Sequence, residues 1–139
     1  ITAATLGHHG SATRIKILPK DFMPDDSGRP VMMEDDNFPG KIHLFSNSSA
    51  NMYALVDIPT GFKATHVKIE GSDTSQHFSV HEGAIDTEVT AQRGADTDIG
   101  TEADITDVTS STTNYLIIRV ESNGTTDQIF GGYVTIAAV

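Results

Sequence analysis

The feature that most constrains this fold is the repeated alternation of short β-prone runs with turn-forming residues. About eight runs rich in Val, Ile, Thr, Phe and Tyr are separated by Gly, Pro, Asn, Asp and Ser. No segment has an apolar stripe at helical spacing over three turns. We therefore predict an all-β, antiparallel two-sheet sandwich, jelly-roll-like, with roughly eight to ten strands. The predicted strands are 13–18, 29–33, 41–46, 51–58, 62–70, 77–82, 114–121 and 127–138, with short edge strands around Thr87–Ala91 and Ala103–Val108.

The chain of 139 residues has the length of one domain and can fold without a disulfide or a metal. It contains no cysteine, which excludes disulfide staples and cysteine zinc sites. Residues 1–12 are small and polar, so we predict a flexible, irregular N-terminal arm followed by a single β-sandwich domain at 13–139. Because the first residue is Ile1 and not Met, we expect the chain to be trimmed from a longer precursor.

Turn chemistry predicts three hairpins. The clearest joins 114–121 to 127–138 through Asn123–Gly124, since Asn-Gly readily takes the positive φ angles of a tight hairpin turn. The second joins 62–70 to 77–82, and the third joins 41–46 to 51–58.

The hairpin registers predict which side chains face the core. In the second hairpin, Ile69 is paired with Phe78 and Val67 with Val80. Gly131–Gly132 indicates a bulge or a closely passing backbone. In the first hairpin, alternation predicts a core formed by Leu116, Ile118, Val120, Phe130, Val134 and Ile136.

The formal net charge of −10 argues against a nucleic-acid partner, because such binding uses Lys and Arg to replace phosphate counterions. No apolar run approaches the length that spans a bilayer, so no membrane partner is expected. Tryptophan is absent, which removes one common means of stacking on sugar rings.

Histidines are the first candidates for a metal site. The second hairpin places His66 across from His81, about 5 Å apart on the outward face, which would suit a two-histidine contact. No third ligand is placed by the sequence, and solvated histidines on an exposed face are the simpler interpretation. An acidic stretch with Asp96, Asp98 and Glu102 lacks the EF-hand spacing for calcium. We expect no metal and no cofactor.

Catalytic motifs are missing from the sequence. It has no Gly-x-Ser-x-Gly elbow and no phosphate-binding glycine loop followed by a helix. A pair of carboxylates could hydrolyse glycosides only at a defined separation, which sequence does not give. We therefore predict a protein that is not an enzyme.

Segments IPTGFKATHVKIEGSDT at 58–74 and DQIFGGYVTI at 127–136, with RIKILPKDFMPDDSGRP near the start, resemble β-sandwich virion proteins of tailed, particularly marine, bacteriophages. The resemblance implies a non-enzymatic structural protein on the virion surface, of the head-decoration or fibre type. It further implies a homo-oligomer, with a trimer favoured, and contacts with other virion proteins. No family catalytic residue is carried over.

For such assembly we predict contacts through apolar residues that strand alternation explains poorly, since methionines and aromatics often lie at interfaces. Filling of the core is the equally weighted alternative. The candidates are Leu6, Ile15, Phe22, Met23, Met32, Met33 and Phe38.

The alternative function is a receptor- or glycan-binding β-sandwich module, with a host-surface glycan as partner and ligand contacts in loops 71–76 and 94–104. Its stacking residues would have to come from Tyr53, Tyr115 and Tyr133, the only tyrosines present. Two of them sharing an exposed face near those loops would favour this alternative, and burial of all three would oppose it.

Overall fold

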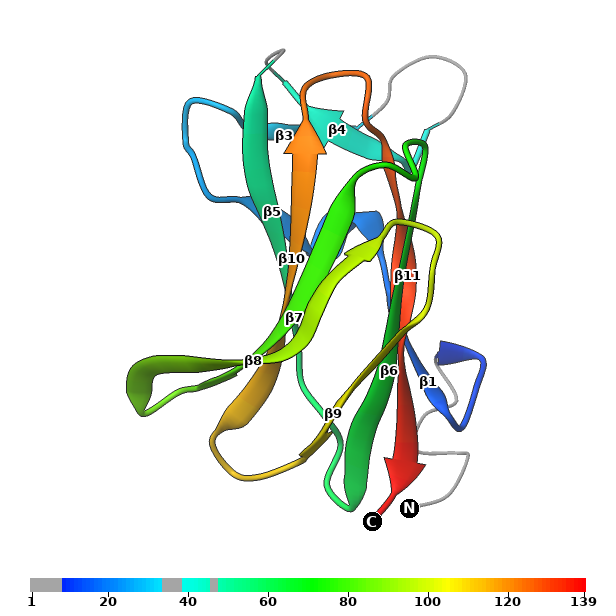
Figure 1. Ribbon diagram of the computed structural model, residues 1–139, viewed down its shortest axis with the longest axis vertical. Coiled ribbons are helices and arrows are strands. Elements are labelled where there is room, and N and C mark those ends of the chain that lie inside the picture. Colours follow the sequence, from blue (N-terminus) through cyan, green and yellow to red (C-terminus); the bar gives the residue numbers. More distant parts are fainter. Residues whose placement is uncertain (1–8, 34–38, 46–47) are drawn as a thin grey trace.

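The computed structural model describes residues 9–33, 39–45 and 48–139. Two antiparallel sheets pack face to face as a jelly-roll sandwich, which confirms the predicted fold class (Figure 1). Sheet A contains β1 (Arg14–Ile17), β3 (Val31–Met33), β4 (Ile42–Leu44), β6 (Phe62–Gly71), β9 (Ala103–Thr109) and β11 (Ile129–Ala138). Sheet B contains β2 (Phe22–Pro24), β5 (Ser49–Val56), β7 (His77–Ala84), β8 (Thr87–Asp98) and β10 (Asn114–Asn123). A short 3₁₀ turn, η2 (Pro19–Asp21), connects β1 to β2.

Strand order runs β3-β4-β11-β6-β9 in sheet A, with β1 also paired to β11, and β2-β5-β10-β7-β8 in sheet B. The predicted edge strands are confirmed, since β8 and β9 each lie at one end of a sheet order. Strand β8 is longer than expected, at 12 residues. Strand pairing in sheet B thus places β5, β10 and β7 side by side, although these strands are distant in sequence.

The core lies between the two sheets and follows strand alternation. Side chains at every second position of β10 are fully buried, as expected for one face of a pleated strand. The predicted inward residues Leu116, Ile118, Val120, Val134, Ile136, Ile69, Val67, Phe78 and Val80 are all buried. Phe130 is the exception: it is 39% exposed, because the bulge between Ile129 and Gly131 rotates it out of the core.

All three predicted hairpins are wrong. Strands β6 and β7 lie in different sheets, and so do β10 and β11, and β4 and β5. Turn residues mark where the chain reverses, but the reversal here leads across the core into the opposite sheet. Hairpin pairs among the described strands are β3–β4 and β7–β8 instead.

Gly131 and Gly132 confirm the prediction of a close backbone approach. Gly131 has a φ of 129°, which disfavours other residues, and a Cβ there would lie 2.6 Å from the Ile17 carbonyl oxygen. A Cβ on Gly132 would lie 2.1 Å from the Lys68 carbonyl oxygen. The two glycines therefore allow β11 to pair on both sides, with β1 and with β6.

The predicted N-terminal arm falls mostly outside the described residues, which begin at His9. His9 accepts a hydrogen bond from the Lys16 backbone N–H at 3.2 Å, and Thr13 accepts one from the Ile136 N–H at 2.8 Å. Among the described residues, no helix is long and apolar enough to cross a membrane.

Candidate functional site

The outward face of sheet B collects aromatic and aliphatic side chains. Alternation on β5 and β10 turns Met52, Ala54 and Leu116 inward, so the residues between them point away from the core. Strand pairing then sets them in rows. We call the following set the sheet B face: Tyr53, Leu55, His81, Tyr115, Ile117 and Arg119.

Two tyrosines share this face. Tyr53 lies across from Arg119, and Tyr115 is four residues from Arg119 along β10, which separates the two rows by about 13 Å. Tyr115 is packed against Gly83, where a Cβ would come within 2.9 Å of its ring. Both tyrosines are half-buried, and neither hydroxyl has a hydrogen-bond partner within the described part of the chain. The two tyrosines share an outward face, but Tyr115 pairs with Gly83 at the end of β10 away from loops 71–76 and 94–104, so the predicted criterion is met only in part.

Arg119 and His81 supply the polar groups of the sheet B face. With Tyr53, Ile117 and Thr90 of β8 they line a shallow depression of about 270 Å³. Arg119 donates from Nη2 to Glu121 at 2.8 Å, and His81 Nε2 lies 3.1 Å from the Ser79 hydroxyl. Partial burial, and then the nearby Arg119 charge, lower the pKa of His81 and so favour its uncharged form.

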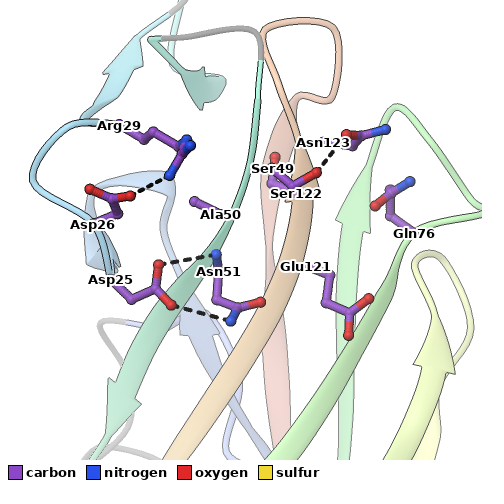
Figure 2. A pocket seen from close by; sticks show the side chains of 10 residues that line it. All are labelled: Asp25, Asp26, Arg29, Ser49, Ala50, Asn51, Gln76, Glu121, Ser122 and Asn123. Atoms are coloured by element: carbon purple, nitrogen blue, oxygen red, sulfur yellow. Dashed lines mark hydrogen bonds and ion pairs between the residues drawn. The ribbon is translucent and has the colours of Figure 1, made fainter.

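A second, more polar depression opens at the end of sheet B where β5 begins and β10 ends. We call it the terminal hollow; its volume is about 530 Å³. Figure 2 shows side chains of the β2–β3 connection on one side, Gln76 on the other, and the ends of β5 and β10 between them. Its lining residues are Asp25, Asp26, Arg29, Ser49, Ala50, Asn51, Gln76, Glu121, Ser122 and Asn123.

Hydrogen bonds hold the walls of the terminal hollow in place. The Asp25 carboxylate accepts from the Asn51 backbone N–H at 3.3 Å and from Asn51 Nδ2 at 3.2 Å. Asp26 accepts from the Gly28 N–H at 2.8 Å and forms an ion pair with Arg29. On the β10 side, Ser49 donates to Asn123 Oδ1 at 2.8 Å. The polar lining is therefore organised before any ligand arrives.

The sheet B face and the terminal hollow are continuous. Asn51 is two residues from Tyr53 on β5, and Glu121 is two residues from Arg119 on β10, so each pair points the same way. Arg119 Nε and Ser122 Oγ are buried side-chain polar atoms without a hydrogen-bond partner among the described residues. Alternation on β10 turns Ser122 toward the core, in the same row as Val120.

The predicted meeting of His66 and His81 is wrong. His66 lies on sheet A, across from Thr135 and Asp104, whereas His81 lies on sheet B, across from Ile117 and Gln92. The two histidines lie on opposite outward faces of the sandwich, because β6 and β7 belong to different sheets and do not form a hairpin. In residues 9–33, 39–45 and 48–139 no three histidine, aspartate or glutamate side chains converge as a metal-holding group.

The acidic stretch near the end of β8 is likewise dispersed by the fold. Asp98 forms an ion pair with His77 at 3.0 Å, and Glu102 accepts a hydrogen bond from the Tyr133 hydroxyl. Asp104 lies 3.7 Å from His66. These carboxylates serve separate partners and share no common centre.

The assembly candidates divide into two groups. Ile15 and Phe22 are 7% and 5% exposed and belong to the core, which corrects their assignment to an assembly surface. Met23, Met32 and Met33 are 61%, 44% and 58% exposed, and their role in contacts stays a prediction. Leu6 and Phe38 lie outside the described residues.

Sequence reasoning missed most of the polar site. Loop 71–76 contributes Gln76, but the acidic and amide groups come from Asp25, Asn51 and Glu121, which sequence reasoning did not bring together. Alternation on β10 would have placed Arg119 and Glu121 on its outward side. No sequence signal could have placed Asp25 beside Asn51, because they meet only through the pairing of β2 with β5.

No family model and no curated protein matches the sequence. Solved structures do match the fold. One is the crystal structure of the CBM22-1 and GH10 modules of Clostridium thermocellum endo-1,4-β-D-xylanase 10B, complexed with xylohexaose. It has a TM-score of 0.51 and 12% identity over 91% of this chain, which corresponds to 28% of that longer chain.

A second match is the C-terminal CBM6 of LamC, a marine laminarinase from Zobellia galactanivorans. The TM-score is 0.52 at 10% identity, covering 88% of this chain and 98% of that one. At this level of identity both matches establish the jelly-roll sandwich alone.

Proposed function

We propose that this chain is a non-catalytic glycan-binding module that holds a carbohydrate along the sheet B face and in the terminal hollow. The observation that carries the proposal is the placement of Tyr53 and Tyr115 on one outward face that leads directly into a polar depression. Aromatic rings stack on the apolar faces of sugar rings, while carboxylate, amide and guanidinium groups bind their hydroxyls.

The matched structures support this proposal by their described roles. Both contain carbohydrate-binding modules, and one is bound to xylohexaose.

A binding role without catalysis agrees with the state of the carboxylates. Asp25 is bonded to Asn51, Asp26 to Arg29 and Glu121 to Arg119, so each acidic group of the hollow already has a structural partner. The hollow is open, and none of these three acidic residues is buried. A general acid is instead usually buried in an apolar site that favours its protonated form.

The test is affinity electrophoresis of the chain through gels containing neutral polysaccharides: xylan, β-1,3-glucan, mannan and galactan. We expect at least one to retard the wild type, and we expect the Tyr53→Ala/Tyr115→Ala double variant to lose about tenfold or more in affinity. Tyr133→Ala is the matched control, because Tyr133 lies on sheet A. Equal retardation of the wild type and the double variant, or no retardation by any glycan, would overturn the proposal.

The predicted virion role concerns where the chain acts and is tested by none of these observations. It is compatible with glycan binding, since a surface protein of a particle can contact glycans of a host. The trimeric state predicted with it stays a separate prediction.

A further inference from the structure

Resting on the proposed function, we infer that this site selects glycans without acid groups, and that Asp25 determines this selectivity. The site would take neutral chains, accept amine-bearing chains at least as well, and reject chains that carry carboxylates or sulfates. The inference follows from how charges are distributed among the residues that line the sheet B face and the terminal hollow.

Every basic side chain in the described lining is already neutralised. Arg119 is paired to Glu121, with Nη2 and Oε1 2.8 Å apart. Arg29 is paired to Asp26 and also donates from Nε to the Ser48 hydroxyl. His81, the remaining basic group of the lining, has a lowered pKa. A carboxylate ligand is bound well by the fork of an unpaired Arg or by the ammonium of an unpaired Lys, and no such group is found among the described residues that line this surface.

Asp25 is the carboxylate of the described lining left without a cation. Its two hydrogen bonds come from the backbone N–H and the side-chain amide of Asn51, which are both uncharged. Three carboxylates (Asp25, Asp26, Glu121) against two guanidinium groups (Arg29, Arg119) leave one net negative charge in the lining. The chain as a whole has a formal net charge of −10, so the background field has the same sign.

The pairing of Arg119 with Glu121 favours the same ligand class. Both side chains are partly exposed, and the guanidinium is already occupied by the Glu121 carboxylate at 2.8 Å. An acid group entering beside it would compete with Glu121 and would be repelled by Asp25. A hydroxyl would disturb neither.

The experiment begins with the neutral polysaccharide that binds best and compares it with its carboxymethyl and aminoethyl derivatives. These two substituents are similar in size and opposite in charge, so a steric effect would weaken both equally. At low salt we expect the carboxymethyl form to bind about tenfold or more weakly than the aminoethyl form. High salt should shrink that ratio, because the lining is solvent-exposed and its charges are screened.

The variant Asp25→Asn should reduce the ratio between aminoethyl and carboxymethyl affinities at low salt by at least about threefold. Asp86→Asn, in the exposed β7–β8 turn, is the control and should keep the wild-type ratio. Equal or tighter binding of the carboxymethyl form would overturn the inference while leaving the proposed function intact. An unchanged ratio in Asp25→Asn would show that Asp25 does not determine the selectivity. If no neutral polysaccharide binds, it is the proposed function that fails.

Discussion

The two outward faces of the sandwich are built from the same alternation but differ in how their side chains are satisfied. On sheet A, long charged residues pair across strands and along them, as Lys63 does with Asp107 and Lys68 with Glu70, both at 2.8 Å. Sheet B also carries charged pairs, such as Arg119 with Glu121 at 2.8 Å, but between them lie the tyrosines and aliphatic residues of the sheet B face. We propose that this apolar part of sheet B is where a ligand binds, whereas the charged residues of sheet A mainly contact one another.

The tyrosines make this difference specific. Tyr133 on sheet A has the Arg14 guanidinium 4.0 Å from its ring centroid and donates its hydroxyl to Glu102. That hydrogen bond, together with partial burial, raises the pKa of Tyr133. Tyr53 on sheet B has no such cover among the described residues. The same residue type therefore makes contacts within the fold on sheet A, whereas on sheet B we propose that it contacts a ligand.

The largest losses of stability are expected at inward positions, where residues of the two sheets are equally buried. Ile69 of sheet A and Val80 of sheet B are both 0% exposed, and an aspartate at either position would bury an unpaired charge. We expect Ile69→Asp and Val80→Asp each to lower the free energy of unfolding by more than about 4 kcal/mol, enough to abolish folding. Circular dichroism and thermal melts measure this. A folded Val80→Asp variant would show that sheet B does not share the core.

The second prediction compares two tyrosines, one expected to affect mainly stability and the other mainly glycan affinity. Tyr133→Ala should lower the free energy of unfolding by about 1–2 kcal/mol, because it removes the contacts with Arg14 and Glu102, and should leave glycan affinity unchanged. Tyr53→Ala should cost less stability and about tenfold in affinity. Chemical denaturation and the binding assay, run on both variants, check this. Loss of binding in Tyr133→Ala at full folding would place the ligand on sheet A.

The third prediction compares a buried and an exposed aspartate. Burial, and then the Asp73 carboxylate, raise the pKa of Asp127, which is 6% exposed. The folded state therefore holds this proton more tightly than the unfolded state, and stability is lost as the pH rises through the interval between the two pKa values. Asp127→Asn should raise Tm at pH 7 by about 2 °C and give no gain near pH 3.

Asp86→Asn controls this measurement, since Asp86 is exposed and its substitution should leave Tm unchanged at both pH values. The Asn123 N–H donates to the Asp127 carboxylate at 2.8 Å, and the amide oxygen that Asp127→Asn introduces can still accept this hydrogen bond. A gain that persists at low pH would attribute the effect to packing and not to ionisation.

The smallest expected effects concern the two histidines that the sequence paired wrongly. His66→Ala should cost less than about 0.5 kcal/mol, because its contact with the exposed Asp104 spans 3.7 Å. His81→Ala should cost about 0.5–1 kcal/mol, because the buried Ser79 hydroxyl loses its partner. Chemical denaturation measures the loss in the free energy of unfolding for each variant. A larger loss for His66→Ala than for His81→Ala would contradict this prediction.

Sequence predicted the inward half of this molecule well and the outward half poorly, for a physical reason. Alternation identifies Leu116, Ile118 and Val120 as core residues whatever strand lies beside them. It cannot assign a strand to a sheet, because Gly and Asn turns serve hairpins and crossovers alike.

The candidate site depended on that missing information. Tyr53, Arg119 and His81 become neighbours through the order β5-β10-β7, which joins segments far apart in the chain. Without this strand order, the sequence prediction placed His66 next to His81 and could not identify a neighbour for Asp25. The tyrosine criterion also depended on the strand pairing, which places Tyr53 and Tyr115 on one face but sets Tyr115 away from loops 71–76 and 94–104.

The direction of β11 has a consequence for how this module could be used. Strand β11 begins at the end of the sandwich where β10 ends and runs to the opposite end (Figure 1). Its first residue, Ile129, pairs with β4 and β6, and its last, Ala138, pairs with Phe62. The rise of a strand separates these two ends by about 30 Å. Thr13 is bonded to the same far end through Ile136. A cargo protein fused after Val139 would thus hang on the side opposite the hollow. Several copies joined in series could bind one long polymer at the same time, because their linkers would not cross the binding surface. Such multivalent binding raises the overall affinity even where each single site binds weakly.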